Sequence, residues 1–398
     1  MSDKRLAYVT TIAALTPIEG KDRIVMASFT DNGWRVIVQK DQFAIGDQAV
    51  YIETDAVLPM WPEFSFLESR CWSKKWNGLR IRTMKMGGVY SEGIAFRLDA
   101  VKKMIAENTG VKTINADDLT EALKIRRVED EVLDRPTNSS PKGFLAKLIW
   151  KLFGINISQK RWGFVTIDFP HYLIKTDETQ AQSIPNLFEK MKGLSVIVTE
   201  KMDGQSLTMA YKDGIFTIST RNRTIYRQKI AKAIRELNPK KAESLRNVST
   251  HAMLAAKYDI PRRLAAKKTF VALQGECVGP GIQKNRLGLK DYDWFVFNRY
   301  DIYTGYYESM KRLAMWCEAE KVPMVKTLDI RNFEWENIEQ LEEYASQFDY
   351  DNGHPAEGVV IRGYGDGCYM DSAFERMHAM LSFKCISKRF RLATQKED

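Results

Sequence analysis

The sequence predicts an α+β protein in which a small all-β module precedes a larger domain that mixes strands and helices. Short strand patterns separated by turn signals run through residues 5–98. From residue 162 onward, strand patterns alternate with helical patterns. The chain has 398 residues. This length is enough for roughly two or three domains that each bury a core.

The strand patterns of the N-terminal module are short and closely spaced. Arg5–Ile18 is strand-like, and Arg23–Phe29 and Trp34–Lys40 form a hairpin around the turn signal Asn32-Gly33. Further strand patterns follow at Gln48–Thr54, Leu79–Met84 and Ile94–Phe96. So many short strands in one stretch predict a small barrel such as an OB-fold for residues 1–98.

Three tryptophans of this module, Trp61, Trp72 and Trp76, are interleaved with basic residues. These basic residues are Arg70, Lys74, Lys75, Arg80, Arg82 and Lys85. Aromatic rings stack on bases and cations meet phosphates, so the mixture predicts contact with nucleic-acid strands. The alternative is that some of the tryptophans only cap the barrel.

Residues 99–161 are predicted to connect the module to a second domain at residues 162–398. A short helix is expected at Ala116–Arg127, and the Pro, Ser and Asn content of Asp134–Pro141 predicts a linker. Phe144–Phe153 is the most apolar segment, but it is too short and too rich in lysine to cross a bilayer. We expect an amphipathic helix packed on its own domain there, with a membrane surface or another protein as the alternative.

Composition is that of a soluble globular protein with polyanionic partners. Hydrophobic residues make up 44% and charged residues 28% of the chain, and the net charge is +9. The five cysteines are odd in number and show no Cys-x-x-Cys spacing. This usage predicts reduced thiols in the cytoplasm and argues against disulfides or a zinc site. The polar N-terminus lacks the apolar core of a signal peptide, and no membrane partner is expected.

One stretch of the second domain combines a buried strand, a lysine and a bend. Leu194–Thr199 is apolar and β-branched, Lys201 follows it, and Asp203-Gly204 marks the bend. A lysine held among buried groups loses its charge easily, and the neutral amine is a nucleophile. The alternative is a surface lysine beside a turn.

Four more charged residues are expected at the ends of later strands. They are Arg221 after the hairpin 207–220, Glu276 after the strand 269–273, Glu357 before the strand 359–362, and Lys384 in the last strand, 381–388. Other strands are expected at Trp294–Tyr303, with Phe295 and Phe297 on one face, and at Val325–Ile330. Helical patterns fill Arg227–Leu237, Pro239–Tyr258, Glu308–Glu320 and Trp335–Phe348.

The order of these residues and their neighbours resembles the covalent nucleotidyltransferases, the group of DNA ligases, RNA ligases and mRNA capping enzymes. Thr199-Glu200-Lys201-Met202-Asp203-Gly204 resembles the nucleophile motif of that group. The other motifs are matched, in the family's order, by Thr220–Asn222, Gly275-Glu276, Phe295–Phe297, Glu357–Val360 and Phe383-Lys384.

The surroundings of the motifs resemble one branch of the group, the ATP-dependent RNA ligases with an N-terminal OB module. The barrel-like module lies in front, and the 14 residues after Lys384 are too few for a domain. Gln205-Ser206 also lacks the arginine that DNA ligases and capping enzymes usually have two residues after the glycine. Ala49–Pro59 and Lys175–Thr179 have close counterparts in this branch.

The resemblance implies an ATP-grasp-like nucleotidyltransferase fold of antiparallel sheets with helices, and an enzyme that joins RNA ends. Lys201 would form a lysyl-AMP intermediate with ATP, and RNA ends or a nicked RNA duplex would receive the adenylate in a repair reaction. Asp203 and Glu357 would hold Mg²⁺ or Mn²⁺, which prefer oxygen ligands.

The resemblance also implies a nucleotide-binding set made of Glu200, Asp203, Gly204, Arg221, Glu276, Phe297, Glu357, Lys384 and Lys388. Phe297 would stack on adenine, with Glu200 on the adenine side. Glu276 would accept from the ribose hydroxyls. Lys384 would meet the α-phosphate and depress the pKa of Lys201 by like-charge repulsion. We expect a monomer.

Two positions depart from the family pattern. Ser382 and Ile386 stand where a second lysine often accompanies Lys384, which leaves Lys388 as a reserve. Gln180 stands where an arginine is expected. The alternatives are a related enzyme that seals DNA nicks or caps RNA with GTP, and a non-catalytic RNA-binding protein of the same fold.

Overall fold

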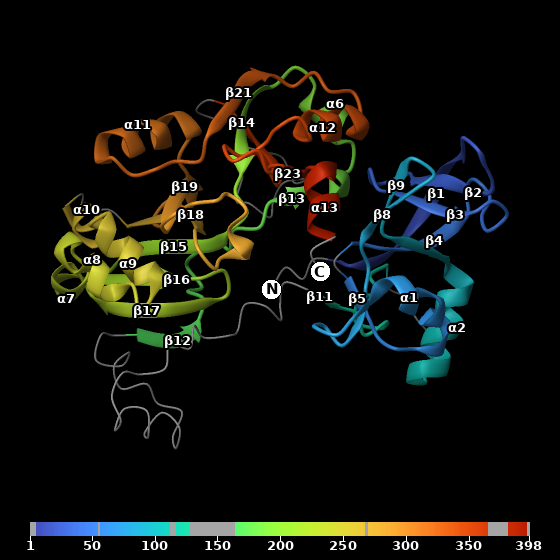
Figure 1. The fold of residues 1–398 in the computed structure, drawn as a ribbon, viewed down its shortest axis with the longest axis horizontal. Helices are drawn as coiled ribbons and strands as arrows, with labels where there is room; N and C mark the ends of the chain where they lie inside the picture. The colour runs from blue at the N-terminus through green and yellow to red at the C-terminus, as the bar shows by residue number, and fades with distance from the viewer. Residues whose placement is uncertain are drawn as a thin grey trace. The chain divides into compact units, whose positions relative to one another are not determined.

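The computed structural model describes residues 5–54, 56–111, 117–127, 164–266, 270–364 and 381–395. The expected linker at Asp134–Pro141 and the expected helix at Phe144–Phe153 lie outside these residues. The chain forms two compact units. Unit 1 comprises residues 1–134, 180–190 and 391–398, and unit 2 comprises residues 135–179 and 191–390. Strands and helices occur in both, so the predicted α+β class is confirmed (Figure 1).

Unit 1 is built on antiparallel strands. Its main sheet has five strands in the order β10-β4-β1-β2-β3, namely Ile94–Arg97, Gln48–Ile52, Ala7–Ile18, Lys21–Phe29 and Arg35–Gln39. A second sheet has the order β11-β5-β7-β6, namely Arg126–Arg127, Ala56–Leu58, Gly78–Arg80 and Trp72–Ser73. The hairpin β8–β9 spans Thr83–Met86 and Val89–Glu92, and the helical segments are η1 (Pro62–Leu67), α1 (Glu68–Cys71) and α2 (Leu98–Thr109).

Segments distant in sequence complete unit 1. The backbone N–H of Gly33 donates to the carbonyl of Gln182 at 2.7 Å, and the Trp34 indole donates to Ser183 Oγ at 3.2 Å. Arg391 donates to the buried carboxylate of Glu92 and, at 2.8 Å, to Gln180 Oε1. The domains predicted from sequence, residues 1–98, 99–161 and 162–398, remain a prediction. The two compact units divide the chain at other positions, because residues 180–190 and 391–398 group with the N-terminal part of the chain.

The expected helix at Ala116–Arg127 is wrong over the described residues 117–127. Residues 120–124 form turns and Arg126–Arg127 is the short strand β11. The Thr120 hydroxyl accepts from the amides of Leu6 and Ala7, at 2.9 and 3.2 Å. These contacts with β1 override the local helical preference, which is worth only tenths of a kcal/mol per residue (roughly 0–0.7).

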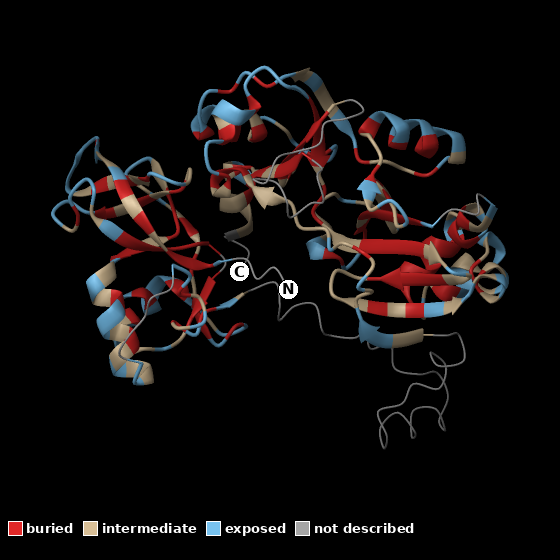
Figure 2. Ribbon diagram, turned by 180° about the vertical axis from the view of Figure 1, so that it is seen from behind, coloured by how far each residue is buried: buried red, intermediate tan, exposed pale blue. Residues whose placement is uncertain are grey.

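Unit 2 contains a seven-stranded antiparallel sheet in the order β12-β17-β16-β15-β18-β19-β20 (Figure 1). Its strands are, in that order, Phe164–Asp168, Arg223–Lys229, Ile215–Ser219, Gln205–Lys212, Val271–Val278, Asp293–Asp301 and Tyr306–Tyr307. Helices pack on one face: α7 (Ile230–Glu236), α8 (Ala242–Leu245), α9 (Thr250–Lys257), α10 (Ile260–Ala266) and α11 (Met310–Glu320). The central strands are buried, as Figure 2 shows.

A second sheet of unit 2 carries β23, β22, β14 and β21 side by side, namely Ser382–Ile386, Gly358–Gly363, Ser195–Lys201 and Thr327–Asn332. Helix α12 (Ile338–Ala345) follows β21 in the sequence, and helix α13 (Lys388–Gln395) follows β23. The chain leaves this sheet at Lys201 and enters the seven-stranded sheet at Gln205, so residues 202–204 connect the two sheets. Among the described helices, none has both the length and the apolar content needed to cross a bilayer.

Two of the expected strand ends are strand interiors. Glu276 lies within β18 and Lys384 at the centre of β23, whereas Lys201 ends β14 and Glu357 directly precedes β22. The apolar run alone marks where a strand is buried on both faces. A strand can continue through a charged residue when the face that carries this residue lines a polar site. The local sequence pattern does not show where this happens.

Gly358 provides a test of how tightly the second sheet is packed. Its φ is +148°, and a Cβ would lie 2.1 Å from the carbonyl oxygen of Cys385 on the neighbouring strand. We expect Gly358→Ala to lower the free energy of unfolding by more than about 3 kcal/mol, measured by urea denaturation. Gly353→Ala is the matched control: its φ is +80°, but no atom lies within 4 Å of the added Cβ. The control should cost only about 1–2 kcal/mol, and equal losses would contradict the close contact.

Candidate functional site

The register of the second sheet places the two predicted catalytic lysines on one face. Lys201 pairs with Gly358, and Gly358 pairs with Ile386. Two residues away along β14, Thr199 pairs with Val360, and Val360 pairs with Lys384. Cross-strand partners share a face, and residues two apart on a strand do too. Lys201 and Lys384 therefore project to the same side of this sheet.

The seven-stranded sheet supplies the facing residues. On β18 and β19, Cys277, Trp294 and Val296 join the core under the helices. The alternating neighbours Glu276 and Phe297 must point to the opposite face. The Arg362 guanidinium of β22 lies 5.7 Å from the centre of the Phe297 ring, so the two sheet faces meet there. The alternation predicted for β19 is thus confirmed, with Phe295 and Phe297 only partly buried.

The Lys201 ammonium is paired with Glu357 across a distance of 2.6 Å between Nζ and Oε1. Burial alone would lower the pKa of Lys201, but the carboxylates of Glu357 and Glu276 outweigh it, and the pKa is raised. The prediction that Lys384 depresses this pKa is therefore wrong for the protein without ligands. The physical reason is that the carboxylates, including that of Asp203, face the lysine, while Lys384 is itself paired with an aspartate.

Asp203 is paired with Arg286, a residue that the sequence reasoning missed. Arg286 Nη1 lies 2.5 Å from Asp203 Oδ2, and both side chains are largely buried. Burial and the charge of Glu357 raise the pKa of Asp203 to about 6, against the opposing effects of Arg286 and Lys201. The charge of Glu357 thus acts on Asp203 through a largely buried part of the site, where the repulsion between two carboxylates is strong.

Glu276 experiences the same accumulation of negative charge. Burial raises its pKa to about 8; Glu357 and Asp203 also raise it, and Lys201 lowers it. Its position on β18, opposite Ser206 of β15, brings it to the connection between the two sheets. Gly204 in that connection has no room for a side chain, because a Cβ would lie 2.5 Å from the Cys277 carbonyl oxygen and 2.8 Å from Glu276 Cγ.

Asp177 holds two of the predicted cations together. Its carboxylate lies 2.8 Å from Arg221 and 3.5 Å from Lys384. The next residue, Glu178, accepts from the buried Arg362 at 2.7 Å and from the Ser382 hydroxyl at 3.0 Å. The charged run before the Lys201 strand thus contributes acceptors that fix the cationic side of the site. Its spacing in the sequence did not indicate which cations it would meet.

An apolar wall lies beside these charges. Met202, Val278 and Val325 form a buried cluster against which other side chains pack. These partly buried neighbours are Leu287, Leu289, Phe295, Phe297 and Met324. Glu200, next to this wall in sequence, is buried, and burial raises its pKa. A flat aromatic ring could therefore be held between Phe297 and aliphatic side chains.

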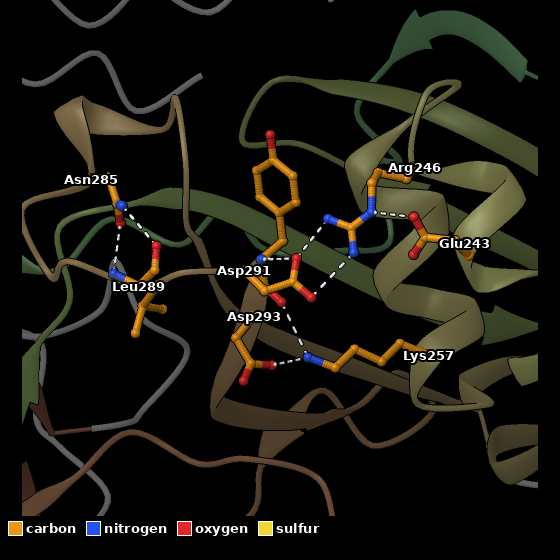
Figure 3. Close-up of polar contacts among 8 residues, drawn as sticks. Glu243, Arg246, Lys257, Asn285, Leu289, Asp291 and Asp293 are labelled. Atoms are coloured by element: carbon orange, nitrogen blue, oxygen red, sulfur yellow. Dashed lines mark hydrogen bonds and ion pairs between the residues drawn. The ribbon is translucent and has the colours of Figure 1, made fainter.

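The loop that carries Arg286, Leu287 and Leu289 is held by polar contacts, which Figure 3 shows. The Asn285 side chain donates to the Leu289 carbonyl at 2.9 Å and accepts from the Leu289 amide at 3.1 Å. Beyond it, Arg246 makes a bidentate contact with Asp291 at 2.6 and 3.2 Å, and Lys257 reaches Asp293 at 3.1 Å. The helices α8 and α9 thus anchor the loop that forms one side of the site.

Lys388 and Gln180 are engaged outside this arrangement. The Lys388 ammonium lies 2.6 Å from the fully buried carboxylate of Glu342 on α12. Gln180 belongs to unit 1, where its side chain accepts from Arg391. The role of Lys388 in nucleotide binding remains a prediction.

The tryptophans of unit 1 differ in exposure. Trp76 is buried and packs on Val57, and Trp61 stacks on Phe64 with 5.9 Å between ring centres. Trp72 is 46% exposed on β6. Of the three tryptophans in this segment, Trp72 is the most exposed and offers a ring for stacking, whereas Trp76 is buried against Val57.

The carboxylates fit a divalent cation held jointly by protein and ligand. No three His, Cys, Asp or Glu side chains gather to hold a metal ion within the part of the chain that the structure describes. Asp203 and Glu357 alone are the two-carboxylate arrangement with which Mg²⁺ is commonly bound, the remaining ligands being water and phosphate oxygens. Glu357 raises the pKa of Asp203 by charge repulsion, and a bound divalent cation would offset that repulsion.

Comparison with known proteins agrees with this geometry. A family model for an OB-fold domain matches residues 6–98, and the RNA ligase family model matches residues 194–369. The OB-fold prediction for the N-terminal module is therefore confirmed. A search of curated protein sequences finds no match.

Solved structures with the same fold include RNA ligases of Naegleria gruberi. One, with PPi, has a TM-score of 0.74 and 23% identity, and the match covers 100% of both chains. A lysine-to-alanine mutant with ATP and Mn has a TM-score of 0.72 and 23% identity, and the match covers 99% of both chains. At this identity the likeness shows the fold.

The raised pKa of Glu276 predicts a pH-dependent cost to folding. A carboxyl group whose folded pKa lies near 8 keeps its proton in the native state, so stability falls as pH rises from about 4.5 to 8. Glu276→Gln should remove on the order of 2 kcal/mol of that fall, measured by urea unfolding at pH 5 and 8.5 with a chelator present. Glu318→Gln, an exposed change on α11, should leave the fall unchanged. The same fall in Glu276→Gln as in the parent would contradict the assignment.

Proposed function

Since the chain carries an RNA ligase domain at residues 194–369 behind an OB-fold domain at residues 6–98, we propose that it is an ATP-dependent RNA ligase. It would join a 3′-hydroxyl and a 5′-phosphate of RNA, as in the repair of nicked duplexes, through a lysyl-AMP intermediate. The observation that carries this proposal is the surrounding of Lys201: a strand-end amine that faces Glu357, Glu276 and Asp203 on one side and shares a sheet face with Lys384.

Three phosphoryl transfers account for the reaction. In the first, Lys201 Nζ bonds to the α-phosphorus of ATP, the α–β P–O bond breaks, and pyrophosphate leaves. In the second, an oxygen of the RNA 5′-phosphate bonds to the adenylate phosphorus and the bond to Lys201 breaks. In the third, the 3′-hydroxyl attacks the activated 5′-phosphorus and AMP leaves. Such transfers depend on positioning and charge stabilisation more than on acid–base chemistry.

The chain's own residues have separate tasks in the first step. Glu357 holds the Lys201 ammonium in the protein without ligands, and this pair must open before the amine can lose its proton and attack. Asp203 and Glu357 are the residues that would bind a divalent cation, which when bound neutralises charge on the phosphates. With Glu357 engaged as a cation ligand, Lys201 would lose the contact that most raises its pKa.

The remaining residues bind the nucleotide. Phe297 and the apolar wall around Met202 suit the adenine ring, and Glu200 would act on the adenine side. Glu276 would accept from the ribose hydroxyls, and Gly204 leaves room for its side chain because a Cβ there would lie 2.8 Å from Glu276 Cγ. Lys384 and Arg221, both tethered to Asp177, supply positive charge for the phosphates or an RNA end.

We propose a cytoplasmic, monomeric enzyme with RNA as its polyanionic partner. The alternatives are a DNA-sealing or GTP-dependent capping relative and a non-catalytic RNA-binding protein. Labelling with ATP against GTP, followed by sealing of nicked RNA against nicked DNA, separates the enzymes. A protein that binds RNA but forms no covalent nucleotide adduct would be the third case.

Lys201→Ala tests the nucleophile. We expect the variant to keep its fold, as measured by circular dichroism. It should form no AMP adduct with radiolabelled ATP on a denaturing gel, because no other amine takes the place of Lys201 Nζ in bonding to phosphorus. Lys212→Ala, at the far end of β15, is the control and should label like the parent. An acid-labile, alkali-stable adduct in Lys201→Ala would identify another lysine as the nucleophile.

Glu357→Gln tests the cation site, since it keeps the shape of the side chain and removes its charge. We expect adenylation to fall by at least about 100-fold and to recover little as Mn²⁺ or Mg²⁺ is raised. The measurement is the rate of adduct formation across a metal titration, with Glu318→Gln as the control. A parental metal response in Glu357→Gln would reduce Glu357 to a structural residue.

Trp72→Ala tests the OB-fold module as an RNA-binding element. Deleting residues 1–98 would strip residues 180–190 and 391–395 of their packing partners, so a point variant is the sharper experiment. Losing one stacking ring should weaken RNA binding by about 1–3 kcal/mol, with a sealing defect that deepens as salt rises and with adenylation unchanged. Ile45→Ala, an exposed apolar control in the same unit, should seal normally. Normal sealing by Trp72→Ala would remove Trp72 from the RNA-binding surface.

A further inference from the structure

The Tyr350 hydroxyl makes hydrogen bonds to the backbone of three residues of the site. It donates to the carbonyl of Lys201 at 3.0 Å, and it accepts from the amide of Asp203 at 3.2 Å and from the amide of Glu357 at 3.0 Å. A phenolic hydroxyl has one donor and two acceptor positions, so these contacts use its whole capacity. We propose that Tyr350 is a positioning residue that fixes the nucleophile and the two cation-binding carboxylates relative to one another.

The three backbone groups that the hydroxyl binds lie at or next to the ends of strands. Lys201 is the last residue of β14, Asp203 lies in the connection between the sheets, and Glu357 directly precedes β22. Buried amides need a partner, and the two amides of Asp203 and Glu357 find it in one oxygen atom. The hydroxyl therefore connects the end of β14, at Lys201, to the start of β22, which Glu357 precedes. The side chains of these two residues form the Lys201–Glu357 ion pair.

Tyr350 is itself held firmly. Its ring is buried, with 4% of the residue exposed, and lies nearly parallel to His354 at 6.5 Å between ring centres. Its amide donates to the His354 carbonyl at 2.8 Å, and its carbonyl accepts from Gly353 at 2.8 Å. The same turn reaches the loop of Arg286, because the Asn352 side chain donates to the Arg286 carbonyl at 2.8 Å. A rigid turn thus presents the hydroxyl to the three backbone groups.

This role deepens the proposed function and rests on it, since the positions of Lys201, Asp203 and Glu357 matter only if they carry out adenylate transfer. Phosphoryl transfer is sensitive to small displacements of the reacting groups. Phe297 and Glu276, which we assign to the base and the ribose, lie on the other sheet, whereas the Tyr350 hydroxyl bonds to Lys201, Asp203 and Glu357. Loss of the hydroxyl should therefore slow the chemical step more than it weakens ATP binding.

Tyr350→Phe tests the inference, with Tyr226→Phe as the matched control. Tyr226 is also fully buried, and its hydroxyl bonds to Glu236 at 3.1 Å on the helix-covered face of the sheet. We expect Tyr350→Phe to lower the rate of lysyl-AMP formation at saturating ATP by roughly 10- to 100-fold, with the KM for ATP changed by less than about threefold. Tyr226→Phe, although destabilised, should keep the parental rate when both variants are folded.

Three outcomes would overturn the inference. The first is a parental adenylation rate in folded Tyr350→Phe, and the second is a raised KM with an unchanged maximal rate. The third comes from amide hydrogen exchange in the parent protein, which does not depend on whether the variant folds. The Asp203 and Glu357 amides should exchange far more slowly than that of exposed Asp351, and rapid exchange would show that the hydroxyl does not bind them. If the parent forms no nucleotide adduct at all, the proposed function fails, while slow exchange would still uphold the hydrogen bonds.

Discussion

The structure of the site depends on the balance of charge around Lys201. An ammonium and three carboxylates share the space between two sheets, with the closest contact the 2.6 Å pair of Lys201 and Glu357. Charges in such a place are tolerable only when they are paired, because burial of an uncompensated ion is costly. Arg286 compensates Asp203, and Asp177 compensates Arg221 and Lys384. Any ligand that brings phosphates and a cation must exchange these partners for its own.

Two levels of support keep this balance in place. Strand register sets the faces, because Lys201 and Lys384 lie two register positions apart on one face of a sheet, and Glu276 and Phe297 alternate with core residues of the other sheet. Connections then set the details. The turn containing Tyr350 fixes backbone groups at the strand ends, and the loop containing Arg286 is anchored to helices α8 and α9 (Figure 3). Rigid strands and fixed connections together limit how far the reacting groups can drift.

Part of the site followed from sequence because its chemistry is local. Lys201, Asp203 and Gly204 stand together at the end of one buried run, and the order of Arg221, Glu276, Glu357 and Lys384 along the chain marked these four as further candidates. The ends of strands were less accessible, since Glu276 and Lys384 continue strands that the apolar pattern seemed to end. Ala116–Arg127 misled for the opposite reason: its helical pattern yields to the hydrogen bonds of Thr120 with β1.

The sequence by itself determined the α+β class, the small barrel in front and most strands, because periodicity and residue type act over a few neighbours. The order of its motifs, through the resemblance to RNA ligases, indicated the candidate site residues. Only the tertiary structure decided the state of those residues. It paired Lys201 with Glu357 so that its pKa rises, and it buried Trp76 while leaving Trp72 exposed. It also brought Arg286 to Asp203 and Tyr350 to Lys201, over 83 and 149 positions of the chain. Such contacts arise from packing between distant segments, and no local pattern encodes them.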